Sequence, residues 1–327
     1  MTNSFTFDEI NKIPGEGDKM VAKRKNSFLF EDSDGSVIKS VRQQAEKLEF
    51  SKIARYRCSQ ITVTQLNGEV TFSAEIGAQY LLSTAKKAAN ILHVKLEDYI
   101  YQTDPKAMEA ALTLVEPLEY LKNNIIFTQN RKGEFVEIFN FQRLTREWEN
   151  FRDNKLSQIE FYQKLKEQST KAAEDIINTG NMEFSDPVNI KSTLSRNLFY
   201  HILLRANVGE ELDNYKVSQL SQLFPNQMLY TDVTISKVSE DASTITLQLV
   251  GDLNRENISD ENLKKQYDEL YKPVIKFNFS EFDQIYRIIY TIDLKTGLLI
   301  DAKAYLSESI KNNYESVTNF DLRRVEL

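Results

Sequence analysis

Glycine, proline, histidine and cysteine are all scarce in this chain. Among 327 residues there are ten glycines, six prolines, two histidines and one cysteine. No set of glycines spells G-x-G-x-x-G or G-x-x-x-x-G-K, which cradle nucleotide phosphates, or the G-x-S-x-G turn of α/β-hydrolases. Two histidines and one cysteine give no zinc-binding spacing. The sequence therefore predicts no cofactor and no metal, and argues against the common nucleotide-binding and hydrolase folds.

The chain also lacks long apolar runs and a basic charge balance. No stretch approaches the roughly twenty apolar residues of a membrane helix, and the N-terminus has no apolar export segment. The lone Cys58 excludes an internal disulfide, which fits a reducing compartment. A net charge of -7 and a pI of about 5.2 disfavour nucleic-acid binding. We expect a soluble cytoplasmic protein with no membrane span and no nucleic acid, unless an export signal has been removed.

What the sequence does contain is a strong strand pattern, clearest in "TVTQLNGEVTFS" at residues 62–73. Asn67-Gly68 predicts a two-residue type I′ turn, because both positions take positive φ. Counting outward pairs Val63 with Phe72 and Ile61 with Ala74, which predicts a core face. The opposite face is polar, and we expect it to be exposed to solvent, as a wet face. Its predicted pairs are Thr64 with Thr71, Thr62 with Ser73, and Gln60 with Glu75.

Similar alternation recurs in both halves of the chain, with helical patterns between. Strands or hairpins are predicted at residues 91–101, 124–139, 229–249 and 285–306. A long amphipathic segment begins at about residue 141 and is expected to end at Gly180, and further helices start at Asp186-Pro187 and Ser259. This order predicts an α+β fold: a twisted or curved antiparallel sheet with helices from the middle of the chain packed on one face.

The domain organisation is predicted from the same strand and helix patterns. Residues 1–35 are predicted to be a polar N-terminal arm. Residues 36–327 are predicted to be a single α+β domain, made of a β block at 50–140, a helical block at 141–225 and a β block at 226–327. A short helix is expected from Ser36 to about Leu48.

The leading functional hypothesis is a non-enzymatic binding or assembly protein. It would engage a protein partner through a polar sheet face or an unpaired strand edge. The sequence leaves the partner's identity and homo-oligomer formation open. The candidate binding residues are Gln60, Thr62, Thr64, Thr71, Ser73, Glu75, His93, Tyr99 and Tyr101.

A first alternative is a carrier for an apolar ligand. The predicted architecture resembles lipoprotein-carrier-like half-barrels, in which the uncovered concave face of a curved sheet holds a ligand or a lipid chain. That resemblance implies an enclosed apolar cavity.

A second alternative is an enzyme. Ser36-Val37-Ile38-Lys39 matches S-x-x-K, Ser195-Arg196-Asn197 matches S-x-N, and Lys295-Thr296-Gly297 is K-T-G. In this order the motifs resemble the signature of penicillin-binding proteins and serine β-lactamases. The resemblance implies serine acyl transfer with Ser36 as nucleophile and Lys39 as its activating partner. The same K-T-G also fits a hairpin turn. A thiol site, in which Cys58 converges with His93 and Glu75, is the other enzymatic hypothesis.

Overall fold

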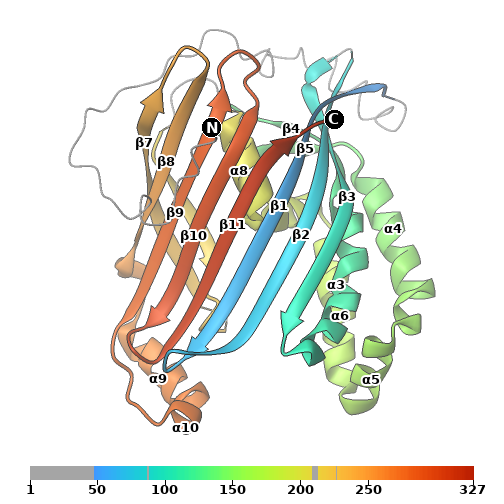
Figure 1. Cartoon of the computed structure of the whole chain (residues 1–327). Coiled ribbons are helices and arrows are strands. Elements are labelled where there is room, and N and C mark those ends of the chain that lie inside the picture. Colours follow the sequence, from blue (N-terminus) through green and yellow to red (C-terminus); the bar gives the residue numbers. More distant parts are fainter. Residues whose placement is uncertain (1–47, 87, 208–212, 226) are drawn as a thin grey trace. The chain divides into compact units, whose positions relative to one another are not determined.

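The computed structural model describes residues 48–327, except 87, 208–212 and 226 (Figure 1). The predicted arm at 1–35, the short helix at 36–48 and both Ser36 and Lys39 lie outside the described residues. Within them no helix is long and apolar enough to cross a membrane.

The described residues form an antiparallel sheet of 11 strands that does not close, together with helices, which confirms the predicted α+β class. The strand order is β5-β4-β3-β2-β1-β11-β10-β9-β8-β7-β6. The strands are β1 (Phe50–Leu66), β2 (Glu69–Ala85), β3 (Ala88–Asp104), β4 (Asn124–Gln129), β5 (Phe135–Ile138), β6 (Tyr215–Leu220), β7 (Met228–Glu240), β8 (Thr244–Leu253), β9 (Phe282–Asp293), β10 (Leu299–Ile310) and β11 (Tyr314–Val325). The helices are α3 (Glu109–Lys122), α4 (Phe141–Asn154), α5 (Glu160–Gln168), α6 (Thr170–Glu183), α7 (Pro187–Arg196), α8 (Leu198–Ala206), α9 (Asp260–Leu270) and α10 (Lys272–Ile275).

The chain divides into two compact units. The helix-rich unit comprises described residues in 48–61, 72–207 and 322–327. The strand-rich unit comprises described residues in 62–71 and 213–321.

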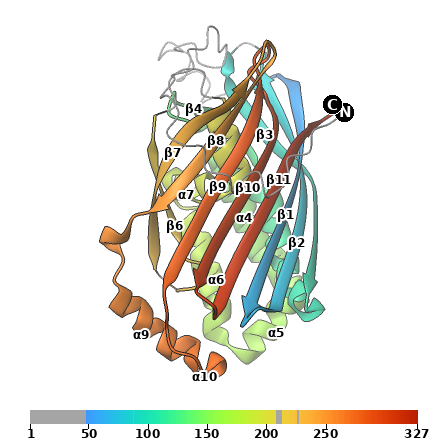
Figure 2. The same cartoon turned by 60° about the vertical axis from the view of Figure 1, so that its left-hand side comes forward.

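In the helix-rich unit the helices cover one face of strands β1–β5 (Figures 1 and 2), as the sequence predicted. Tyr80 of β2 stacks on Phe199 of α8 with ring centroids 3.9 Å apart, and Tyr56 of β1 lies beside the same ring. Tyr200 of α8 contacts Phe127 of β4. These aromatic side chains are buried, so the core of this unit lies between the sheet and the helices.

The long helix expected after residue 141 is wrong in two respects. The segment breaks into α4, α5 and α6, and α6 continues through Gly180 to Glu183. Gly180 does not end the helix because it serves packing: a Cβ there would lie 2.2 Å from Cη2 of Trp148. The glycine therefore lets α6 approach the buried indole ring of α4. The helix predicted at Asp186-Pro187 is confirmed, with the Asp186 carboxylate accepting from the Val188 N–H.

In the strand-rich unit, β7 pairs with β8 and β9 pairs with β10, as predicted. Asn67 and Gly68 have φ values of 51° and 82°, which confirms the type I′ turn between β1 and β2. Helix α9 begins after Ser259, whose hydroxyl accepts from the Asn262 N–H. The core beneath these strands contains Leu223, Phe224, Leu229, Leu263, Tyr267, Ile275, Phe282 and Ile310.

Candidate functional site

Strand β3 changes phase at Glu97, and this change builds a polar cluster in the helix-rich unit. Leu96 pairs with Tyr80 while Asp98 pairs with Gln79, so Glu97 is an extra residue in β3. Leu96 and Tyr99 are buried on the helix-covered side, and Glu97 and Asp98 between them turn to the uncovered side. A β-bulge of this kind re-aims side chains without ending the strand.

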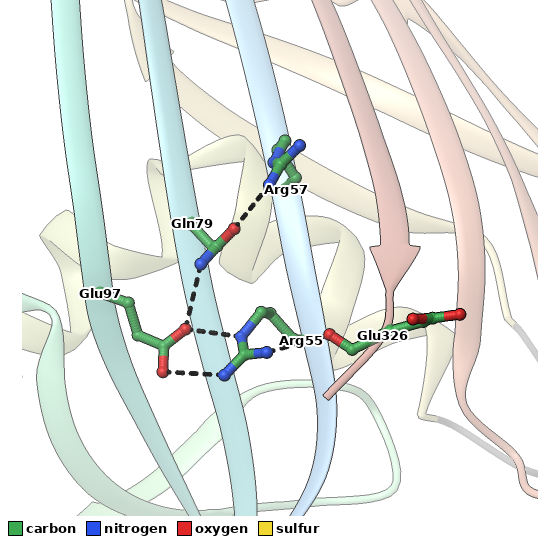
Figure 3. A network of polar contacts seen from close by, with 5 residues as sticks. All are labelled: Arg55, Arg57, Gln79, Glu97 and Glu326. Carbon is green, nitrogen blue, oxygen red and sulfur yellow. Dashed lines mark hydrogen bonds and ion pairs between the residues drawn. The ribbon is translucent and has the colours of Figure 1, made fainter.

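The bulge brings Glu97 into a hydrogen-bonded row that crosses three strands (Figure 3). The Arg55 Nε–H donates to Glu97 Oε2 at 2.7 Å, and its Nη2–H donates to Oε1 at 3.4 Å. Gln79 Nε2 donates to Glu97 Oε2 at 3.2 Å, and Arg57 Nη2 donates to Gln79 Oε1 at 3.1 Å. Arg55 also donates to the backbone carbonyl of Glu326. Side chains from β1, β2 and β3 are thereby fixed relative to one another.

The charges in this row are not equivalent. The hydrogen bond from Arg55 lowers the pKa of Glu97, and Glu97 raises the pKa of Arg55, so the two neutralise each other. The exposed guanidinium of Arg57 is in no ion pair with a described residue. Beside this row, the Ile100 side chain lies over Gly77 and is 63% exposed. The uncovered face thus presents a positioned cation on β1 and an exposed apolar side chain on β3, with β2 between them.

The sequence placed Tyr99 and Tyr101 on the wrong face of β3 in this unit. Tyr99 and Tyr101 were expected on the same polar face as His93, but the bulge turns them toward α3. Burial raises the pKa of both phenols, with acidic Glu116 of α3 nearby. His93 is half-buried, its Nε2 lies 2.9 Å from Asn124 Oδ1, and burial lowers its pKa. Gln60 and Ser73 are half-buried and Glu75 is exposed.

In the strand-rich unit the predicted wet face of the hairpin is only partly exposed. Thr62 is half-buried, and its hydroxyl lies 3.2 Å from the hydroxyl of Thr318, which is buried. Thr64 is half-buried, and exposed Thr71 donates to its carbonyl. Ile61, the adjoining residue of the helix-rich unit, was assigned to the core face but is 39% exposed. The hydroxyl of Thr62 thus meets a buried residue of the neighbouring strand β11, which lies 256 residues away in the sequence.

The thiol hypothesis is not supported, because Cys58 is 5% exposed and burial raises the pKa of its thiol. The thiol lies on the side of the buried aromatic ring of Tyr80, whereas His93 lies on the other side of β3 with Glu97. Of the serine motif, only the later elements fall in described residues. Lys295-Thr296-Gly297 forms the turn between β9 and β10, where the Thr296 hydroxyl accepts from the Leu298 N–H. Asn197 caps α8 by accepting from the Phe199 N–H.

One buried carboxyl group in the strand-rich unit was not predicted. Glu308 of β10 is 3% exposed and accepts hydrogen bonds from Ser221 Oγ at 2.5 Å and the Gln222 N–H at 2.9 Å. Burial raises the pKa of this carboxyl group. Its strand phase, shared with Leu306 and Ile310, is the sequence signal that could have placed it in the core. The carboxyl group thus binds the segment between β6 and β7 to strand β10.

Among the described residues, no group of three or more His, Cys, Asp or Glu side chains could hold a metal ion. No protein-family model and no curated protein matches the chain. Among solved structures, the chain is similar to one described as lipid–protein interactions in lipovitellin. The TM-score is 0.41 and the identity 8%, over 84% of this chain and 25% of that chain. The present chain therefore spans about a quarter of that protein's length.

Proposed function

We propose that this protein is a non-enzymatic binding protein, and that the uncovered face of β1–β3 engages a protein partner. The observation that carries the proposal is the exposed Arg57 guanidinium, held by Gln79 and left without an ion-pair partner among the described residues. Arginine is enriched at interface hot spots because its planar fork binds carboxylates with fixed geometry.

The neighbouring side chains favour this assignment. The Arg55–Glu97 pair is already satisfied, so it positions the row without competing for a partner's charge. Ile100 offers apolar area on the same face, on β3, with β2 between it and the cation on β1. A partner that presents a carboxylate to Arg57 and an apolar side chain to Ile100 would match both features. Because strands hold these groups, little conformational entropy would be lost on binding.

The test begins with a photo-crosslinking residue at position 100, introduced in the source cell, with position 171 of α6 as the control. The partner captured only from position 100 is then titrated against purified variants. We expect Arg57→Glu to weaken binding by about tenfold or more. Lys171→Glu makes the same charge change on an exposed helix position and should leave binding unchanged.

Equal affinity of wild type, Arg57→Glu and Ile100→Asp for every partner captured would refute the proposal. The carrier hypothesis stays a prediction of the sequence. So does serine acyl transfer, since Ser36 and Lys39 lie outside the described residues.

A further inference from the structure

The strand-rich unit exposes three large apolar side chains between the end of α9 and the residues that follow α10. Leu270 is 47% exposed, Val274 68% and Phe277 59%. Figures 1 and 2 place α10 at one end of this unit. Single exposed apolar residues are ordinary on protein surfaces, but here three lie within eight consecutive residues. We refer to residues 270–277 as the α10 tip.

Hydrogen bonds from buried side chains fix the backbone at the end of this tip. Tyr267, fully buried, donates from its hydroxyl to the Phe277 carbonyl at 3.1 Å. Asn313 donates from Nδ2 to the Tyr267 hydroxyl at 3.0 Å and to the Asn278 carbonyl at 2.9 Å. Between these anchors Lys276 takes a left-handed conformation with φ of 65°. Lys276 is the C-cap of α10, and its left-handed backbone ends the helix and turns the chain toward Phe277.

Asn313 also connects the α10 tip to a second exposed apolar side chain. Its carbonyl accepts from the Asn67 N–H of the turn between β1 and β2 at 2.8 Å. Val70, three residues after Asn67, is 59% exposed. Both views show this turn and α10 at the same end of the strand-rich unit. One buried asparagine therefore fixes both parts of this end.

The charge of the tip favours one class of partner. Residues 270–277 contain Lys272 and Lys276 and no acidic residue, and Asp268 and Glu269 directly precede them, in a chain whose net charge is -7. Lys276 is exposed, and Lys272 lies 3.3 Å from Asp268 of the preceding turn. Apolar side chains interleaved with lysines are typical of segments that lie in a membrane interface.

We propose that the α10 tip docks on the surface of a lipid bilayer that carries anionic headgroups. Val274 and Phe277 would enter the boundary between headgroups and acyl chains, and the two lysines would contact the headgroup charge. The tip shares no residue with the proposed protein-binding face, so it is tested independently of the proposed protein partner.

The first experiment attaches a polarity-sensitive fluorophore to the full chain carrying Val274→Cys. Cys58 is buried with a raised pKa, so labelling is directed to the new thiol. The probe is added to vesicles of phosphatidylcholine alone or mixed with phosphatidylserine. We expect a blue shift with the mixed vesicles. The same label at Val188→Cys, a 61% exposed position in α7, should give none.

Vesicle flotation of unlabelled variants gives a second readout. We expect Phe277→Asp to weaken partitioning by about tenfold, since burial of its apolar surface is lost. The double change Lys272→Gln and Lys276→Gln should weaken partitioning about tenfold, and only where phosphatidylserine is present. Val188→Asp is the matched control and should bind as the wild type does.

The absence of any spectral shift at position 274 with both vesicle types would overturn the proposal. So would flotation that is equally strong for wild type and Phe277→Asp. If Phe277→Asp instead converts a dimer to a monomer and the label ignores lipid, the tip is a protein contact and the lipid assignment is wrong.

Discussion

Replacing Gly180 by alanine tests the packing that organises the helix-rich unit. In an exposed helix this change stabilises by about 1 kcal/mol, because alanine loses less backbone entropy. Here the new Cβ would lie 2.2 Å from Cη2 and Cζ2 of Trp148, far inside van der Waals contact. The ring cannot shift freely, because it stacks on Phe184 with centroids 5.5 Å apart and its Nε1–H donates to Asn181 at 3.0 Å.

The packing losses and the gain in helix propensity change the free energy of unfolding in opposite directions. Overpacking a core costs about 1–3 kcal/mol, and displacing the indole would also lose a hydrogen bond of about 1 kcal/mol. These losses exceed the gain in helix propensity. We therefore expect Gly180→Ala to lower the free energy of unfolding by about 2 kcal/mol.

The assay is urea unfolding followed by tryptophan fluorescence. Trp148 is the only tryptophan in the chain, so its emission reports on the helix-rich unit specifically. Trp148→Phe removes the colliding edge of the ring, and by circular dichroism Gly180→Ala should cost less in that background. If Gly180→Ala instead raised the stability by about 1 kcal/mol, as helix propensity alone predicts, the packing argument would be refuted.

Three further predictions concern titratable groups. Because burial raises the pKa of Glu308, the wild type should lose stability relative to Glu308→Gln as pH rises through that pKa. Urea unfolding midpoints of both proteins across pH 4–8 measure this. The same dependence of the midpoint on pH in both proteins would contradict it. The pKa of Glu97 is lowered by Arg55, so the advantage of the wild type over Glu97→Gln should shrink as pH falls through that pKa; an advantage that persists in acid would exclude the ion pair as its cause. Cys58 should resist iodoacetamide in the native protein and react in urea, as mass spectrometry would show; rapid native alkylation would mean that the thiol is accessible.

Local sequence patterns were enough to predict most of the fold. The Asn67-Gly68 turn and the Asp186 cap could be predicted because their chemistry lies within a few neighbouring residues. Strand alternation likewise predicted the β7–β8 and β9–β10 hairpins. The fold class followed from the order of these elements.

The candidate site could not be predicted, because it depends on contacts between distant residues. The bulge at Glu97 exists only in the pairing of β3 with β2, and it moves Tyr99 to the helix side. The partner of Thr62 is Thr318, near the other end of the chain. Arg55 and Arg57 alternate with buried Tyr56. This alternation predicts that one face of β1 is exposed, but it does not predict which helices cover the other face.

The extra residue in β3 also determines how this strand tolerates mutation. Before position 97, the even-numbered residues Val94 and Leu96 are enclosed, whereas beyond it the odd-numbered Tyr99 and Thr103 are. A saturation scan of β3 should therefore display sensitivity that switches from even to odd positions within one uninterrupted strand. Deleting Glu97 would bring both halves into a common parity, so that β3 could pair with β2 without a bulge and still keep Leu96 and Tyr99 on the helix-covered side.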